Sequence, residues 1–228
     1  VEYEERYYAA WPQGHVEDWE APDGKTYSVG ALLFNDERVG CFAFEICEDA
    51  FRSQHPSGQS TLAGAEIILN PSASWFSMGK HNLRRDLVKV RSREGLCAYL
   101  YASLLGTDNT RLIFDGAGLI CAEGEILAEA DRLRIDREIN VVDAWVDLGS
   151  LRRSRRETGS WRRQASQVSQ VNQVNQSQSK AMTHVKLGVW ASADVDLVNQ
   201  ANQVTIAISP DYLPKEATST EPSLDWWV

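Results

Sequence analysis

The chain has 228 residues and a formal net charge of −9, with 43% hydrophobic and 24% charged residues. This composition is typical of a globular protein large enough to bury a core without disulfides or metals, and its acidity argues against a nucleic-acid partner. The sequence contains neither an apolar run long enough for a membrane helix nor a signal-like start, so we expect a cytoplasmic protein with no membrane segment.

Apolar runs separated by turn residues predict a series of short strands in the first part of the chain. These strands are residues 27–34, 39–47, 65–69, 96–105, 112–121, 126–130 and 141–146. Leu83, Leu87 and Val88 recur at helical spacing and predict a helix over residues 79–94, which Gly95 closes. Because a strand–helix–strand crossover lies among the strands, the sequence predicts an α/β fold with a layered sheet.

The character of the sequence changes after residue 150. Residues 151–163 are rich in arginine, and residues 164–179 form a tract of Gln, Asn, Ser and Val. Such a tract buries too little apolar surface to offset its ordering entropy, so we expect a flexible linker or insertion. We expect the arginines to form a solvated or docking surface. Residues 183–190 allow one more strand, and residues 209–224 predict a second linker.

The two ends of the sequence suggest that it is part of a longer protein. It starts at Val1 and ends at Trp226, Trp227 and Val228. Two tryptophans at a surface terminus are unfavourable unless further chain covers them. We therefore expect a fragment.

The spacing of the cysteines indicates neither a zinc site nor a disulfide framework. Cys41, Cys47, Cys97 and Cys121 include no C-x-x-C pair and lie in apolar segments, which is typical of a reducing compartment. We expect Cys41, Cys97 and Cys121 to be small buried side chains.

Cys47 differs because it ends an apolar strand and precedes Glu48 and Asp49. Ligands in α/β folds bind at the carboxyl ends of strands, where main-chain N–H groups can also stabilise an oxyanion. A nucleophilic thiol and a core-filling cysteine both fit this pattern, and the pattern alone favours the core-filling interpretation.

A series of motifs in order resembles the carbon–nitrogen hydrolase (nitrilase) superfamily. They lie at residues 40–49, 64–74, 99–103 and 114–116, and the segment Ile46-Cys47-Glu48-Asp49 is most similar to the glutaminase domain of glutamine-dependent NAD(+) synthetases. The resemblance covers residues 2–160. It implies a nitrilase-like four-layer αββα sandwich over residues 1–150, incomplete at its start, followed by a linker over residues 151–228.

The resemblance also implies a reaction and a set of site residues. Cys47 matches the nucleophile that attacks the side-chain amide of glutamine, expels ammonia and leaves a thioester. Glu4, within Tyr3-Glu4-Glu5-Arg6-Tyr7-Tyr8, matches a catalytic glutamate of the family. Glu48, Ser74 and Lys80 match positions that hold the α-amino and α-carboxylate groups of glutamine, for which a carboxylate and an ammonium group are suited.

Some family features have no match in these 228 residues. The general-base glutamate and the catalytic lysine are two of them, so we expect little or no glutaminase activity from this chain alone. The sequence also contains no glycine-rich phosphate-binding loop. We therefore expect no cofactor in the fragment, and expect ATP and magnesium to bind to an absent synthetase domain that amidates deamido-NAD.

Other interpretations remain open. The chain could be a free-standing nitrilase-family amidase that acts on another small amide, or an inactive scaffold. We expect a homo-oligomer, as in the family. We expect Asp115 and Gly116 to form a structural turn. His15, His55, His81 and His184 have no carboxylate partner at a recognisable sequence spacing, and we expect them to be structural or surface residues.

Overall fold

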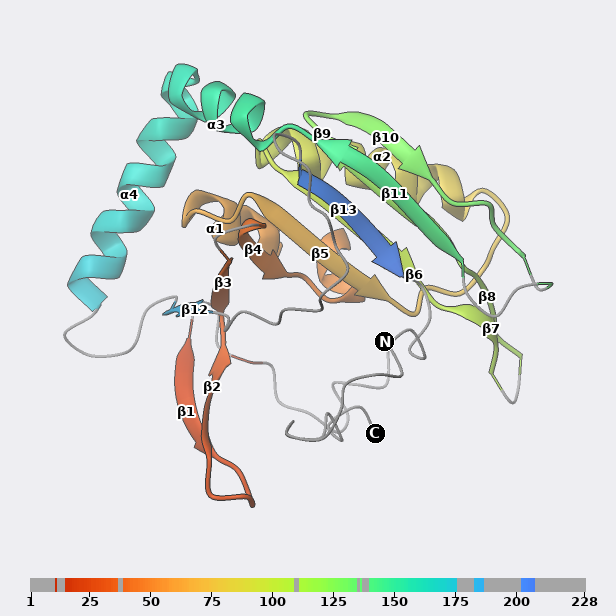
Figure 1. Cartoon of the computed structure of the whole chain (residues 1–228), viewed down its shortest axis with the longest axis horizontal. Helices are drawn as coiled ribbons and strands as arrows, with labels where there is room; N and C mark the ends of the chain where they lie inside the picture. The colour runs from red at the N-terminus through yellow and green to blue at the C-terminus, as the bar shows by residue number, and fades with distance from the viewer. Residues whose placement is uncertain are drawn as a thin grey trace.

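The computed structural model describes residues 15–36, 39–108, 111–134 and 140–175, together with Trp11, Asp136, 183–186 and 202–207. The environment of side chains is described up to residue 167. Strands β1 (Val16–Glu20) and β2 (Thr26–Gly30) form an antiparallel hairpin that projects from the body of the structure (Figure 1). Within the described residues, no helix combines the length and apolarity needed to cross a membrane.

The body is built on a seven-stranded sheet in the order β10-β9-β6-β5-β4-β3-β12. Its strands are β3 (Leu32–Asp36), β4 (Gly40–Phe44), β5 (Ile67–Ser72), β6 (Ala98–Ser103), β9 (Gly118–Ala122), β10 (Glu125–Glu129) and β12 (Thr183–Lys186). The central strands β4, β5 and β6 run parallel, so their carboxyl ends meet at one edge of the sheet. On either side, β3 pairs with β4 and β9 pairs with β6 in antiparallel fashion.

Each face of this sheet is covered by a different layer. One face packs against α2 (Lys80–Glu94), which contributes Val88 to a core that includes Tyr99 and Leu119. The other face packs against β11 (Val141–Val146) and its antiparallel partner β13 (Asn202–Ala207), as Figure 1 shows. The core on that side joins Leu100 to Val146 of β11. The α/β prediction is confirmed, and the described residues supply one helical layer and two sheet layers.

Two of the predicted strands are interrupted by glycines. The prediction of one strand over residues 27–34 is wrong, because β2 ends at Gly30 and β3 begins at Leu32. Gly30 has a φ of 126°, and a Cβ there would lie 2.1 Å from the His15 carbonyl oxygen. The predicted strand 112–121 is likewise divided at Gly116, with φ of 65°, into β8 (Ile113–Asp115) and β9. β8 pairs with β7 (Leu105–Thr107) outside the main sheet. The hairpin of β9 and β10, the helix α2 and the strand β11 are confirmed.

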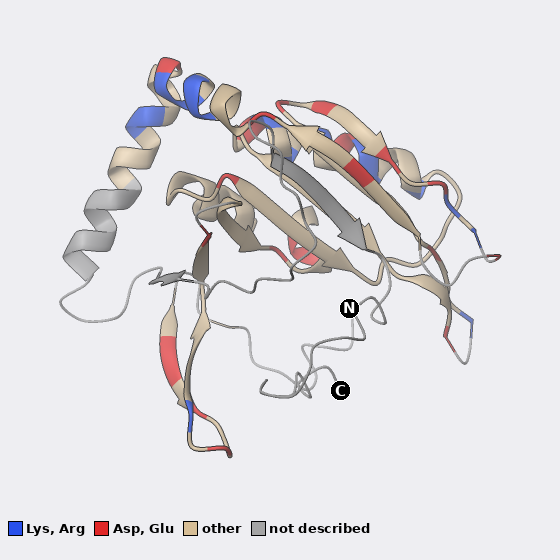
Figure 2. Ribbon diagram, viewed as in Figure 1, with Lys and Arg blue, Asp and Glu red and all other residues tan. Residues whose placement is uncertain are grey.

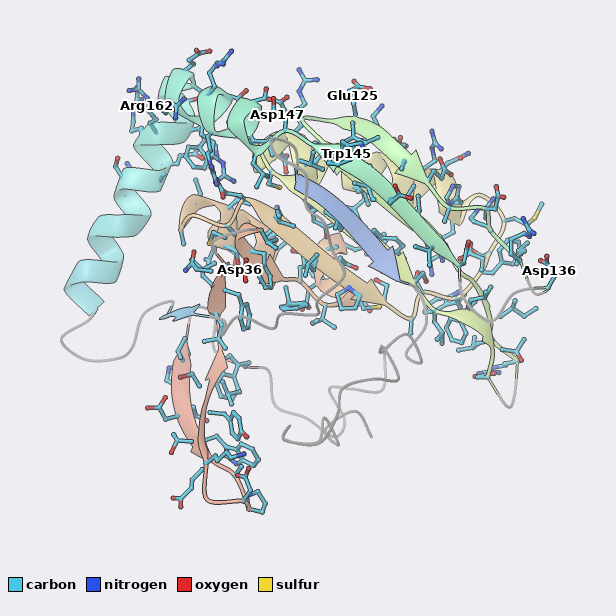
Figure 3. The ribbon with its side chains drawn as sticks, viewed as in Figure 1. Asp36, Glu125, Asp136, Trp145, Asp147 and Arg162 are labelled. Atoms are coloured by element: carbon cyan, nitrogen blue, oxygen red, sulfur yellow. The ribbon has the colours of Figure 1, made fainter. Side chains whose placement is uncertain are left out.

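Residues 148–175 form two helices, which differs from the flexible linker or insertion predicted for the Gln/Asn/Ser tract. Helix α3 (Leu148–Glu157) is capped by Asp147, whose carboxylate accepts the N–H of Ser150 at 3.0 Å (Figure 3). Helix α4 (Gly159–Asn175) then extends through most of the Gln/Asn/Ser tract. No proline interrupts this stretch, and Gln is a good helix former, so local propensity outweighs its low hydrophobicity. Residues 209–224 lie outside the described residues.

The arginines of α3 are not uniformly solvated, although Figure 2 shows basic residues gathered along α3 and the first turns of α4. Arg155 is only 8% exposed and donates to the carbonyl oxygens of Ala65 at 2.6 Å and Leu96 at 2.9 Å. Its guanidinium also lies 4.8 Å from the centre of the Trp161 ring. Of the two predicted roles, solvated or docking, Arg155 has the docking one, because it holds α3 against the segments that precede β5 and β6.

Candidate active site

Cys47 follows the carboxyl end of β4. The strand ends at Phe44, so Cys47 does not close it as predicted but begins a short 3-10 helix, Cys47–Phe51. Its φ is 48°, a left-handed conformation that is uncommon for a residue with a side chain. Such a conformation persists only where the surrounding structure holds it, and it occurs often at functional sites.

Cys47 is also the one cysteine that is not buried. Cys41, Cys97 and Cys121 are buried, as predicted. Burial raises the pKa of Cys41 to about 11 and the pKa of Cys97 and Cys121 to about 12. Since the thiolate is the reactive form, these three are poor nucleophiles at neutral pH. The half-buried Cys47 is the remaining candidate.

Glu48 lies next to the cysteine but already has a partner. Its carboxylate forms an ion pair with the guanidinium of Arg52, one turn further along the chain. The Arg52 side chain is 61% exposed, so the ion pair is weak and another cation can readily replace Arg52 beside Glu48.

Ser74 lies in the loop after β5, and a buried arginine fixes its position. Arg84 of α2 is fully buried and donates through Nη2 to the Ser74 carbonyl oxygen at 2.7 Å and to Ser74 Oγ at 3.2 Å. The same nitrogen donates to the Trp75 carbonyl oxygen at 3.0 Å. Through Nη1, Arg84 donates to both carboxylate oxygens of Asp115 at 2.8 Å. Asp115 therefore has a structural role, as predicted. It exerts this role through its ion pair with Arg84.

Lys80 begins α2 and lies beside Cys47 and Glu48. Its Nζ stands 3.6 Å above the centre of the Trp75 ring. Burial lowers the pKa of Lys80, and the charge of Arg84 lowers it further, whereas Cys47 and Glu48 act in the opposite direction. The structure therefore brings Cys47, Glu48 and Lys80 within electrostatic reach of one another. Glu4 lies outside the described residues.

A buried polar network next to Cys47 was not predicted from the sequence. It consists of Glu45, Tyr99 and Asn70, which come from three neighbouring strand segments. Glu45 and Asn70 are each 1% exposed, and Tyr99 is fully buried. An acidic residue within an otherwise apolar stretch was the available signal, because a buried carboxylate requires hydrogen-bond partners.

Three of the histidines have carboxylate partners, which their spacing along the sequence had not indicated. His55 Nδ1 lies 3.7 Å from Glu45 Oε1, His81 Nε2 lies 2.5 Å from Glu129 Oε1, and His15 Nε2 lies 3.6 Å from Glu17 Oε2. For His55 and His81 the partner comes from a different element, so spacing along the chain could not reveal it. His184 lies in β12, where the environment of side chains is not described.

A cavity of about 390 Å³ lies on another part of the structure. It is formed by α1 (Pro56–Leu62), the end of α2 and the start of α4, and its lining includes His55, Arg91 and Trp161. Neither Cys47 nor Lys80 lines it. The candidate active site is therefore the sheet edge at Cys47, not this cavity.

Comparison with known proteins gives a consistent set of relatives. No family model matches the chain. The glutamine-dependent NAD(+) synthetase of Saccharomyces cerevisiae is 35% identical over 170 residues, which cover 72% of this chain and 24% of that protein. The enzyme of the same name from Drosophila melanogaster is 30% identical over 156 residues, covering 65% of this chain and 20% of that protein.

A solved structure supports the same relationship. The crystal structure of a glutamine-dependent NAD(+) synthetase from Cytophaga hutchinsonii matches with a TM-score of 0.50 and 38% sequence identity. The match covers 57% of this chain and 20% of that one. The chain thus spans between a fifth and a quarter of the length of these relatives.

Proposed function

Because the chain belongs to the glutamine-dependent NAD(+) synthetases, within their carbon–nitrogen hydrolase region, we propose that it contributes glutamine amide hydrolysis to NAD biosynthesis. The observation that carries this proposal is the placement of Cys47. It is the one accessible cysteine, it has a strained backbone, and it lies beside Glu48 and Lys80 at the carboxyl end of the parallel strands.

In the proposed reaction, the Cys47 thiolate attacks the side-chain amide carbon of glutamine. The carbonyl oxygen becomes an oxyanion, which N–H groups at the start of the 3-10 helix are placed to stabilise, since the first turn of a helix leaves such groups without intrahelical partners. The carbon–nitrogen bond breaks and the nitrogen leaves as ammonia after gaining a proton. Water then hydrolyses the thioester, which releases glutamate and restores the thiol. We propose Glu4 as a catalytic carboxylate.

The charges near Cys47 suit the two ends of an α-amino acid. Glu48 would bind the α-ammonium group of glutamine in place of Arg52, and Lys80 would bind the α-carboxylate. The burial that lowers the pKa of Lys80 also strengthens such an ion pair, because the local dielectric is lower than in water. Ser74, held by Arg84, is proposed as a further polar contact.

The ammonia would serve the ATP- and magnesium-dependent amidation of deamido-NAD. The 228 residues contain no glycine-rich phosphate-binding motif, so no residue of this chain is assigned to ATP or magnesium. We propose that this step takes place on a synthetase domain outside these residues, and that residues 151–228 lead toward it.

Covalent labelling tests the proposal without requiring turnover. A diazoketone analogue of L-glutamine, 6-diazo-5-oxo-L-norleucine, loses N₂ when a thiol attacks its terminal carbon and forms a stable thioether. Intact-mass and peptide analysis should show one adduct, on Cys47, which excess glutamine suppresses. The Cys47→Ser variant should not be labelled, whereas the matched Cys121→Ser variant should be labelled normally.

The other outcomes identify the alternatives. Labelling suppressed by a simple amide such as propionamide but not by glutamine would indicate a different amidase and overturn the choice of substrate. A folded chain that is not labelled at Cys47 would contradict the nucleophile and favour the scaffold interpretation.

A further inference from the structure

A buried chain of hydrogen bonds connects a carboxylate to the backbone of Cys47. Glu45 lies two residues before the cysteine, and its Oε1 accepts the N–H of Ser57 at 2.9 Å. Its Oε2 accepts the hydroxyl proton of Tyr99, from the neighbouring strand β6. Burial and the charge of Glu45 raise the pKa of Tyr99 well above its ordinary value, so this hydroxyl keeps its proton.

Asn70 completes the chain. Its Nδ2 donates to the Tyr99 hydroxyl oxygen at 3.1 Å and reaches the Cys47 carbonyl oxygen at 3.5 Å. Its Oδ1 accepts the Ser72 hydroxyl at 2.6 Å, and because the Cys47 carbonyl oxygen can only accept, the Nδ2 side of the amide faces Cys47. The hydrogen bonds therefore all run in one direction: Asn70 donates to Tyr99, and Tyr99 donates to Glu45.

The far end of the 3-10 helix is held independently. Arg91 of α2 donates through Nη2 to the carbonyl oxygens of Ala50 at 2.8 Å and Arg52 at 3.1 Å. At the near end, the N–H of Asp49 donates to the Ile46 carbonyl oxygen at 3.0 Å, and Asn70 adds the side-chain contact at the Cys47 carbonyl oxygen. The φ of 48° at Cys47 is a conformation that such contacts must maintain.

We infer that Tyr99 and Asn70 are positioning residues that hold the Cys47 backbone in its left-handed conformation and so orient the thiol toward the amide carbon. They touch no reacting atom, and they act through Cys47. This inference rests on the proposed function, because it requires Cys47 to be the nucleophile. A small misplacement of a nucleophile lowers the rate of attack without weakening substrate binding.

The chain offers a matched control. Tyr101 lies two residues along β6, is also fully buried, and its hydroxyl finds no hydrogen-bond partner among the described residues. Tyr99→Phe and Tyr101→Phe therefore each delete one buried hydroxyl from the same strand. Only Tyr99→Phe removes a hydroxyl from the hydrogen-bond series that leads to Cys47.

The test measures labelling of Cys47 by 6-diazo-5-oxo-L-norleucine as a function of concentration. Tyr99→Phe should lower the saturating rate constant about five- to tenfold. This is the rate factor that corresponds to the free energy of about one hydrogen bond lost in the transition state. The half-saturating concentration should change less than about twofold, because substrate binding does not depend on the hydroxyl. Tyr101→Phe should leave both values within about twofold of the unmodified chain.

Asn70→Ala provides a second route and should give the same loss of rate. Equal saturating rates for Tyr99→Phe and Tyr101→Phe, with normal labelling of the unmodified chain, would overturn the inference while leaving the proposed function intact. A lower melting temperature for Tyr99→Phe with an unchanged rate would also overturn it, since the hydroxyl would then be only structural. Failure to label the unmodified chain at Cys47 would instead refute the proposed function.

Discussion

The buried ion pair between Arg84 and Asp115 predicts a large loss of stability when one partner is removed. Asp115 is 1% exposed and Arg84 is fully buried, and two hydrogen bonds of 2.8 Å join them. In Asp115→Ala, Arg84 keeps only neutral acceptors, the Ser74 carbonyl and hydroxyl and the Trp75 carbonyl. An uncompensated buried charge costs about 3–5 kcal/mol, so we expect the free energy of unfolding to fall by about that amount.

An ion pair of equal length that is partly exposed provides the control. Arg152 Nη2 lies 2.8 Å from Glu66 Oε2, and the side chains are 51% and 12% exposed, respectively. Solvent reaches the Arg152 side of this pair, so Arg152→Met should cost less than Asp115→Ala. Urea unfolding followed by circular dichroism gives both values. If Asp115→Ala costs no more than Arg152→Met, burial does not set the energetics of this site and the reasoning fails.

Three further predictions concern cysteine reactivity, pH and backbone strain. Iodoacetamide at pH 8 should modify Cys47 first. Cys97, whose pKa is about 12, should stay unmodified until the chain unfolds. Peptide analysis that finds Cys97 labelled before unfolding would contradict this. Burial, followed by the charge of Arg91, lowers the pKa of His55 below its ordinary value of 6.5, so the unfolded chain binds more protons just below pH 6.5. The free energy of unfolding should therefore fall as the pH falls below 6.5, and His55→Gln should flatten this dependence in urea titrations. Gly30→Ala should accelerate amide hydrogen exchange in β1 far more than Gly24→Ala. A Cβ at Gly30 would lie 2.1 Å from a carbonyl oxygen, whereas a Cβ at Gly24 would meet nothing within 4 Å. Equal exchange rates in the two variants would refute the steric argument.

The elements that the sequence predicted well are those whose signal is local. Helix α2 combines helical spacing of Leu83 and Leu87 with Gly95 at its end, and β11 is a short apolar run, so both predictions agree with the structure. Two of the missed strand boundaries fall at Gly30 and Gly116, where the chain takes a positive φ. A glycine within an apolar run can continue a strand or break it, and the choice depends on which strand pairs next to it, which spacing does not record.

The same distinction separates the parts of the site that could be predicted. Cys47 was predicted because it follows an apolar run and precedes two acidic residues in a family motif, and Glu48 and Lys80 because they match positions of the same family. Tyr99 lies 29 residues from Asn70 and 54 from Glu45, so their hydrogen bonds exist only after β4, β5 and β6 align in parallel. Parallel pairing brings residues that are distant in sequence to the same edge, and the register decides which of them meet. A motif can therefore identify a nucleophile, while the groups that orient it become visible only once the register of the sheet is known.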